Sequence, residues 1–170
     1  DYADLIEKSY GGFELYQRTG TPIHPMSPLS KIFWMRHEEP KIFKQTAMFA
    51  DLKTYVLFQL YERFVIDYSL GSATGMMNLE QLDWDNKALE LFGIERNQLP
   101  QLVPTTHVLT GMKKRYAKLM GIDEQTPVIV GASDGVLSNL GVNSYQKGEV
   151  AVTIGTSGAI RTVINQPKTD

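Results

Sequence analysis

Hydrophobic residues recur at helical spacing, with interruptions, through the first part of the chain. The stretch 2–18 shows this spacing weakly and is broken by Gly11-Gly12. Residues 19–28, TGTPIHPMSP, are dense in Pro and Gly and predict a loop or an extended segment. Ser27-Pro28 predicts the start of a helix, because Ser caps well and Pro suits the first turn. Pro40 is expected to end that helix.

The middle of the chain predicts short helices alternating with short strands. Asp51 is a plausible N-cap for a helix through Tyr61, and RFVIDYS predicts a strand. Residues 83–92 predict a second amphipathic helix closed by Gly93, while LPQLVP is read as irregular. Further expected elements are strands in SATGMMNL and THVLTG and a helix from Met112 to Met120. The apolar stripe expected on the first of these helices consists of Leu52, Tyr55, Val56 and Leu60.

The last forty residues change to an α/β pattern. TPVIVGAS is a continuous apolar run after a Pro, which is typical of a buried strand. Residues 134–142 can form a helix. EVAVTIGTSG and AIRTVI then predict two strands joined by a turn of small residues, a hairpin-like unit.

Composition narrows the possible classes of protein. The 170 residues are 42% hydrophobic and 21% charged, with a formal net charge of −2, as expected for a globular domain. This balance gives no general electrostatic surface for nucleic acid or an anionic membrane. No apolar stretch approaches the length of about 20 residues that spans a bilayer. Cysteine is absent, so the chain has no disulfide and no thiolate metal site, which fits a cytoplasmic protein.

GASDG, residues 131–135, is the first candidate for chemistry. Asp134 lies where the predicted buried strand gives way to a helix, the end of a strand at which α/β folds collect ligands. A carboxylate there can accept a proton from a hydroxyl or help to hold a hydrated metal ion. The small neighbours allow a substrate to approach closely. Asp134 could instead be a simple helix cap. Spacing alone slightly favours this second interpretation.

GTSG, residues 155–158, is the second candidate. Gly155, Thr156 and Ser157 offer successive backbone N–H groups and two hydroxyls with little bulk, which suits phosphate oxygens. The segment is neither a P-loop nor a GxGxxG fingerprint. An ordinary hairpin turn is the alternative, and taken alone it explains the segment better. The occurrence of two such turns, each after a predicted strand, is more informative than either one.

The order GASDG, then TIGTSGAIR, resembles the FGGY carbohydrate kinases. The resemblance extends backwards through HPMSPLSKIFWMRHEEP, which is similar to the family's substrate loop and following helix, and through DLKTYV and VIDYSLGSATGMMNL. LDWDNKALELFGI, LPQLVP and TPVIVGASDG follow in the family's order. The match runs from about Thr19 to the end of the chain. Within the family, TPIHPMSPLSK and GTSGAIRT most resemble the gluconate kinases.

The resemblance implies roles for individual residues. Asp134 matches the base that activates the sugar hydroxyl, and Gly155, Thr156 and Ser157 match the turn that contacts ATP phosphates. His24 matches the position of a sugar-binding residue in the substrate loop, with a surface loop residue as the alternative. Arg161 could pair with the carboxylate of gluconate, or it is a solvent-facing strand residue. ATP and Mg²⁺ are the implied cofactors, and no resident metal site is expected.

The resemblance also implies a partial actin-like, ribonuclease-H-like α/β fold. Residues 1–145 would form the later part of the N-terminal sugar-binding domain, and residues 146–170 the first hairpin of the C-terminal ATP-binding domain. The family's D-x-G-T-[ST] hairpin has no match here, and the first residue is not Met. An internal piece of a longer kinase is therefore expected, with little or no activity alone.

The implied activity is ATP-dependent phosphorylation of D-gluconate to 6-phosphogluconate by the full-length protein, for which a homodimer is expected. Three alternatives stay open. A related kinase would act on xylulose, glycerol or another polyol. A non-catalytic fragment would bind a sugar without turnover. An ATP-hydrolysing chaperone or actin relative would share the fold but would use no sugar acceptor.

Overall fold

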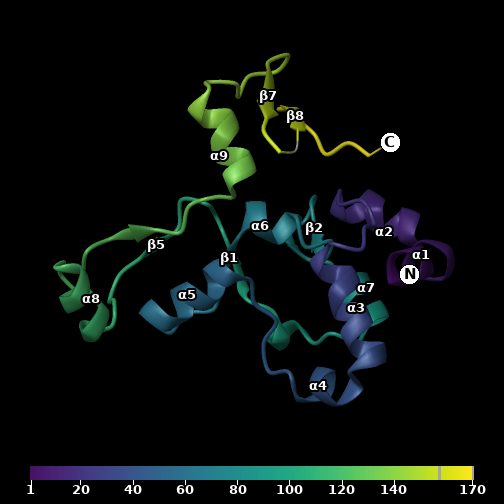
Figure 1. Ribbon diagram of the computed structural model, residues 1–170, viewed down its shortest axis with the longest axis horizontal. Helices are drawn as coiled ribbons and strands as arrows, with labels where there is room; N and C mark the ends of the chain where they lie inside the picture. Colours follow the sequence, from purple (N-terminus) through teal and green to yellow (C-terminus); the bar gives the residue numbers. More distant parts are fainter. Residues whose placement is uncertain (157, 170) are drawn as a thin grey trace.

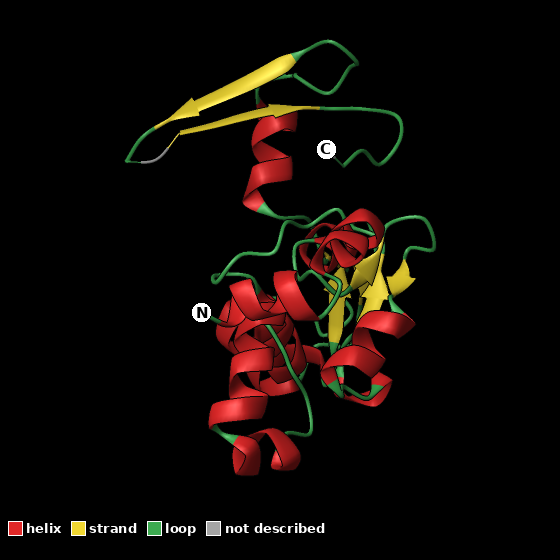
Figure 2. Cartoon of the chain, turned by 90° about the vertical axis from the view of Figure 1, so that its right-hand side faces the viewer, coloured by secondary structure: helices red, strands yellow, loops and turns green. Residues whose placement is uncertain are grey.

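The chain folds into a helix-rich body followed by one helix and a β-hairpin that stand apart from it (Figures 1 and 2). The computed structural model describes residues 1–156 and 158–169. The helices are α1 (Tyr2–Ser9), α2 (Gly12–Thr19), α3 (Pro28–Glu38), α4 (Pro40–Gln45), α5 (Leu52–Tyr61), α6 (Tyr68–Ser72), α7 (Asn86–Phe92), the 3₁₀ turn η1 (Arg96–Gln98), α8 (Lys114–Met120) and α9 (Asp134–Gly141). The strands are β1 (Val65–Asp67), β2 (Met77–Asn78), β3 (Asp83–Trp84), β4 (Gln101–Val103), β5 (Val108–Leu109), β6 (Val128–Ile129), β7 (Val150–Ile154) and β8 (Gly158–Thr162).

Side-chain caps fix the starts of several body helices. Ser27 caps α3 and Asp51 caps α5, each by accepting a hydrogen bond from a backbone N–H three residues later, as the sequence predicted. Asp85 caps α7, so this helix begins after the strand β3 rather than at Asp83. Pro40 ends α3 but also occupies the first turn of α4, a short helix that the sequence pattern did not predict.

The buried face of α5 differs from the predicted stripe. Thr54, Leu57 and Tyr61 point into the protein. By contrast, Leu52 is 79% exposed and Tyr55 is 54% exposed. Apolar residues surround this helix, so their spacing does not select one face. The buried hydroxyl of Thr54 decides it instead, because it donates to the carbonyl of Val65 at 3.0 Å.

LPQLVP contains a strand, contrary to the expectation of irregular structure. Its residues Gln101–Val103 form β4, which pairs in parallel with β1, Val65 opposite Gln101 and Asp67 opposite Val103. Prolines on either side limit the strand to three residues. A pairing partner 36 positions away in the register therefore determines this element, and no local pattern reveals it.

TPVIVGAS forms a strand, but not the buried one that its apolar run predicted. β6 pairs with β5 antiparallel, Val108 opposite Ile129. Ile129 is 63% exposed, whereas Val130, just after the strand, is buried. In the described part of the chain, no further strand pairs with β6, so this short ladder stays at the surface.

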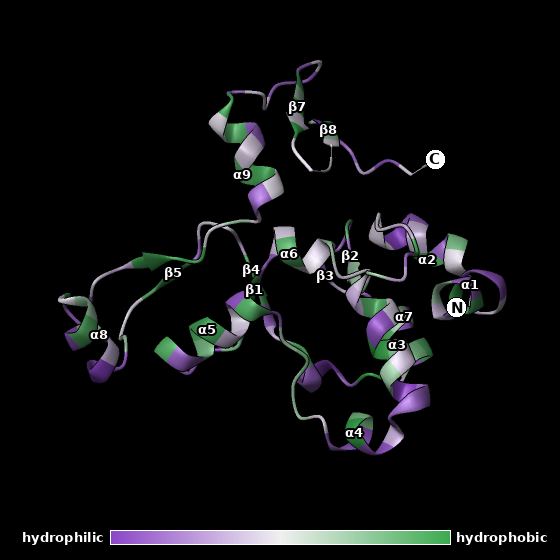
Figure 3. Cartoon of the chain, viewed as in Figure 1, coloured by the Kyte–Doolittle hydropathy of each residue, from purple (hydrophilic) through white to green (hydrophobic). Residues whose placement is uncertain are grey.

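Two hydrophobic clusters form the core of the body. The larger cluster lies among the N-terminal helices, α7 and strand β1, and Phe33 is at its centre, with ring centroids 4.9 Å from Tyr10 and 5.1 Å from Phe92. The smaller cluster joins α5, β1, β4, β5 and α8. Figure 3 shows hydrophobic residues along α5 and β5, and among them Leu52 and Val108 are exposed. The body therefore has a substantial core and a partly apolar surface.

Beyond Gly131 the chain forms α9 and the antiparallel β7–β8 hairpin, both as predicted. Val150 pairs with Thr162 and Ile154 with Gly158. The expected domain boundary at 145/146 lies between α9 and β7 and stays a prediction. Among the described helices, none has the length and apolar character needed to cross a membrane.

Candidate active site

The GASDG loop (residues 131–135) connects β6 to α9 and is held by backbone hydrogen bonds to the segment after β4. The amide of Val130 donates to the carbonyl of His107 at 2.9 Å, and the amide of Gly131 to the carbonyl of Thr105 at 3.0 Å. Gly131 has a φ of +75°, a left-handed conformation that glycine adopts without steric cost. The chain can thereby turn from the strand into α9.

Asp134 is the first residue of α9, and Ser133 occupies the N-cap position. The Asp134 side chain is exposed, and it forms no hydrogen bond or ion pair with the described residues. Asp134 therefore does not act as the side-chain cap that spacing alone favoured. Its carboxylate stands at a helix N-terminus, where the helix dipole favours negative charge, and is available to a ligand.

Arg161 reaches the same place from strand β8. A Cβ atom built on Gly135 would lie 3.3 Å from the Nε atom of Arg161, so the guanidinium rests against the first turn of α9. Its Nη1 atom donates a long hydrogen bond to the Thr153 hydroxyl at 3.4 Å. Within the described residues the guanidinium has no carboxylate partner. Arg161 is half-buried rather than fully turned to solvent, and it lies against Gly135, the residue after Asp134.

The GTSG turn (residues 155–158) lies between β7 and β8 in the sequence and includes the first residue of β8. Gly155 and Thr156 are exposed, and Ser157 lies outside the described residues. The strands bring this turn to the free end of the hairpin, which extends beyond α9 (Figure 2). The structure thus joins the hairpin to the start of α9 through Arg161 and leaves Gly155 and Thr156 open to solvent.

His24 lies in the substrate loop (residues 20–27), which connects α2 to α3, and its side chain is exposed. Its Nδ1 atom accepts a hydrogen bond from the amide of Met26 at 3.1 Å. An accepting Nδ1 carries no proton, so the neutral ring has its N–H at Nε2. The ring can therefore donate to a hydroxyl without being protonated. The structure brings His24 into no direct contact with Asp134 or Arg161.

The short helix α6 ties the substrate loop to the GASDG loop. At one end, the Thr21 hydroxyl donates to the carbonyl of Ser72 at 2.6 Å. At the other end, the Ser69 hydroxyl accepts from the amide of Ser133 at 2.8 Å. The two loops that carry His24 and Asp134 are thus held by opposite ends of one helical turn.

Sequence reasoning missed Lys53, which lies beneath the GASDG loop. Its ammonium group contacts the buried carboxylate of Asp67 and the carbonyl oxygens of Val130 and Gly131. Asp67 and Ser69 form hydrogen bonds with each other and with Lys53 and Ser133. A lysine two residues after the helix cap Asp51 carries no local signal of its partner.

Comparison of the sequence and the structure with known proteins identifies the family of this chain. The family model for the N-terminal domain of the FGGY family of carbohydrate kinases matches residues 1–141. The structure superposes on the gluconate kinase from Lactobacillus acidophilus with a TM-score of 0.95, at 38% sequence identity, over 99% of this chain and 34% of that one. The chain has a partial actin-like α/β fold, as the sequence predicted. It belongs to the FGGY family of carbohydrate kinases.

Two relatives indicate where in the family it stands. The chain is 55% identical to the gluconokinase of Bacillus subtilis over 99% of its own length. It is 30% identical to the xylulose kinase of the same organism over 78% of its length. The chain spans 33% of that gluconokinase, about a third of the relative's length.

Proposed function

We propose that the whole protein transfers the γ-phosphoryl group of ATP to a sugar acid, D-gluconate, and forms 6-phosphogluconate. The observation that carries this proposal is the exposed, unpaired carboxylate of Asp134 at the start of α9, in a chain 55% identical to a gluconokinase. Similarity to the xylulose kinase is much lower, at 30%. Gluconate is therefore the preferred substrate over a neutral ketose.

Asp134 would act as the general base. As the terminal hydroxyl oxygen of the sugar attacks the γ-phosphorus, its proton passes to the Asp134 carboxylate. The bond between the γ-phosphorus and the bridging oxygen breaks, and ADP leaves with that electron pair. A carboxylate that is exposed and unpaired, as here, needs no rearrangement to accept the proton.

Mg²⁺ would arrive as part of the ATP substrate. Within the described residues, no group of three metal-ligating side chains lies together. This fits Mg²⁺, which commonly uses one or two protein carboxylates and the phosphates of its nucleotide. Asp134 is the carboxylate that this chain would offer, and Gly155 and Thr156 would contact the phosphates, together with Ser157.

Arg161 and His24 would bind the substrate. Arg161 lies against Gly135, the residue after Asp134, and has no carboxylate partner among the described residues, which suits a fixed cation that pairs with a sugar acid. His24 would donate from Nε2 to a sugar hydroxyl. We also propose that residues 1–145 belong to the sugar-binding domain and 146–170 to the ATP-binding domain. A cytoplasmic location and a homodimer stay predictions.

A substrate panel with MgATP and the whole protein tests the function. Gluconate is expected to give the highest kcat/KM, ahead of xylulose and glycerol. Asp134→Asn should lower kcat by about 10²–10⁴-fold, the usual contribution of a general base. Asp123→Asn, at an exposed aspartate in the turn after α8, is the matched control and should be near wild type. Near-normal phosphotransfer by Asp134→Asn would refute the assignment of the base.

A further inference from the structure

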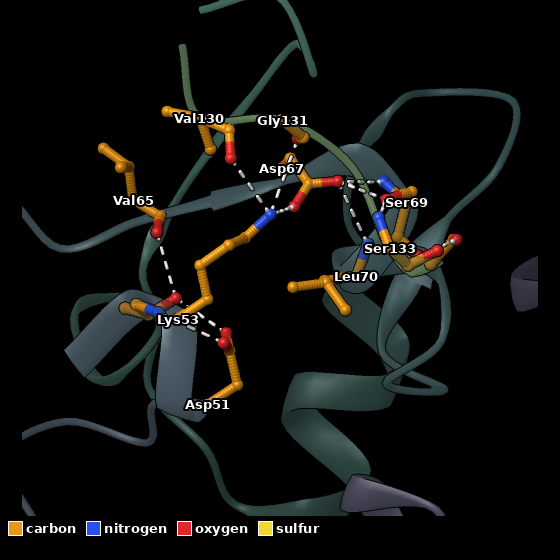
Figure 4. Close-up of polar contacts among 11 residues, drawn as sticks. Asp51, Lys53, Val65, Asp67, Ser69, Leu70, Val130, Gly131 and Ser133 are labelled. Carbon is orange, nitrogen blue, oxygen red and sulfur yellow. Dashed lines mark hydrogen bonds and ion pairs between the residues drawn. The ribbon is translucent and has the colours of Figure 1, made fainter. Parts of the chain in front are cut away.

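An ion pair lies directly beneath the GASDG loop (Figure 4). The Asp67 carboxylate is fully buried, and its Oδ2 atom receives a hydrogen bond from the ammonium group of Lys53. The same ammonium group lies 3.4 Å from the carbonyl oxygen of Val130 and 3.5 Å from that of Gly131. Lys53 therefore bridges the end of β1 and the first residue of the GASDG loop.

The second oxygen of Asp67 holds the start of α6. Its Oδ1 atom accepts from the amide of Ser69 at 3.0 Å, from the amide of Leu70 at 3.3 Å and from the Ser69 hydroxyl. Burial alone raises the pKa of the Asp67 carboxyl, but the hydrogen bonds from Lys53 and Ser69 and the positive charge of Lys53 outweigh it and hold the pKa below its ordinary value. The carboxylate is thus a charged acceptor on which both sides of the network converge.

The Ser69 hydroxyl connects this hydrogen-bond network to Ser133, the residue before Asp134. Because its proton is donated to Asp67, its oxygen accepts the amide hydrogen of Ser133, at 2.8 Å and 64 residues away in the sequence. Ser133 is the N-cap residue of α9, so this bond fixes the point at which the helix starts. Asp134 is the next residue, and the direction of its carboxylate depends on that start.

We propose that Lys53, Asp67 and Ser69 form a positioning clasp that fixes the GASDG loop and thereby sets the position of Asp134. This inference rests on the proposed role of Asp134 as the base. None of the three residues touches the substrate. They act through Ser133 and the carbonyls of Val130 and Gly131.

The clasp explains why a charge is buried at the end of a short strand. A buried ion pair is often no more stabilising than well-packed hydrophobic residues of similar volume, because its charges must be desolvated. The Asp67 carboxylate does hold its hydrogen-bond donors in one arrangement, because a donor that moved away would leave a buried charge unsatisfied. A base must stand within hydrogen-bond reach of its hydroxyl, and a displacement of about 1 Å can reduce the rate by about 10²-fold.

The experiment uses the whole protein, with kcat and both KM values as readouts. Ser69→Ala leaves the Lys53–Asp67 pair in place and removes two hydrogen bonds of one hydroxyl, the one it donates to Asp67 and the one it accepts from Ser133, so it should fold. We expect kcat to fall by about 10-fold or more with the KM for ATP unchanged. Ser72→Ala is the matched control, because this hydroxyl lies in the same helix but donates only to the carbonyl of Ser69. It should keep the wild-type kcat.

Lys53 is tested by a pair of substitutions. Lys53→Met removes the charge and should lower kcat by about 10²-fold. Lys53→Arg keeps a cation and should recover most of that loss. Lys118→Met, at an exposed lysine on α8, controls for loss of a surface charge. If Lys53→Met does not fold, Ser69→Ala decides the question alone.

Hydrogen exchange of the Ser133 amide gives a readout that does not depend on activity. In Ser69→Ala this amide loses its acceptor and should exchange faster, while amides in the core of the body keep their rates. Unchanged Ser133 exchange together with a wild-type kcat would overturn the clasp. A whole protein that phosphorylates no sugar would refute the proposed function instead, and the exchange result would still test the clasp.

Discussion

The body of the chain and its C-terminal unit (residues 134–164) bury their apolar residues to very different degrees. The body has two hydrophobic clusters with several fully buried side chains. In the described part of the C-terminal unit, Ala151 is the one buried apolar residue. Its exposed large apolar residues are Val136, Leu137, Leu140, Val142, Tyr145, Val150, Val152, Ile154, Ile160 and Ile164.

This difference indicates that two kinds of interaction hold the two regions. Hydrophobic burial holds the body. The C-terminal unit is instead placed by a polar contact at the start of α9, where the amide of Ser133 donates to the Ser69 hydroxyl, and Arg161 rests on Gly135 within the unit. The proposed base stands at this junction. Its position therefore depends on a few hydrogen bonds, whereas the loops that surround it are anchored to a packed core.

The largest expected effect is a loss of stability in the body. Phe33 is completely buried between Tyr10 and Phe92, so Phe33→Ala removes a full aromatic side chain from the larger cluster. We expect the free energy of unfolding to fall by about 3–5 kcal/mol. Urea denaturation followed by circular dichroism measures the change. A loss below 1 kcal/mol would show that the body does not depend on this cluster.

The second prediction concerns the buried charge at the junction. Asp67→Asn keeps an acceptor for the Ser69 and Leu70 amides but removes the charge that attracts Lys53. The free energy of unfolding at pH 7 should fall by about 1.5–3 kcal/mol, the range for hydrogen bonds to charged groups.

The pH dependence of the stability loss in Asp67→Asn tests the direction of the pKa shift of Asp67. The pKa of Asp67 is lower in the folded state than in the unfolded chain, since Lys53 and Ser69 outweigh burial. Its stabilisation is therefore present above the unfolded pKa of about 3.9 and is lost as the pH falls through the lower, folded pKa. The difference between wild type and Asp67→Asn should shrink below about pH 4. A difference that stays constant down to pH 2 would contradict the ion pair.

The third prediction compares one glycine from each region. A Cβ on Gly71 in α6 would lie 2.5 Å from Cδ2 of Leu102, so Gly71→Ala should cost about 1–2 kcal/mol through overpacking. Gly141 in α9 has nothing within 4 Å of the same position, so Gly141→Ala should stabilise by about 0.5 kcal/mol through lower unfolded-state entropy. Thermal melting of both variants tests the opposite signs, and equal signs would refute the difference in packing.

Sequence patterns identified the elements whose signals are local. Ser27 and Asp51 cap their helices as predicted, and the hairpin after residue 149 forms because two apolar runs flank a turn of small residues. Patterns failed where distant pairing decides. The strand β4 exists through β1, and the buried face of α5 follows a bond from Thr54 to Val65.

The same distinction holds for the candidate site. Asp134 was identified from a strand-end turn and the ordered motifs around it, and its role stays a prediction. Lys53 could not be identified, because its partner Asp67 is 14 residues away and the carbonyls that it contacts are more than 70 residues away. The sequence of a loop does not show which distant residues contact it.

The smallest expected effect tests most directly the difference in apolar burial between the body and the C-terminal unit. Ile154→Thr keeps a β-branched residue in β7 at a side chain that is 86% exposed, so the free energy of unfolding of the 170-residue chain should change by at most about 0.5 kcal/mol. The matched control is Ile66→Thr in β1, which is 3% exposed and should cost about 1–3 kcal/mol, since it buries a hydroxyl in place of an ethyl group. Urea denaturation measures both. A loss of more than 1 kcal/mol for Ile154→Thr would show that the hairpin is packed rather than placed by its polar junction, because an exposed side chain has no burial to lose.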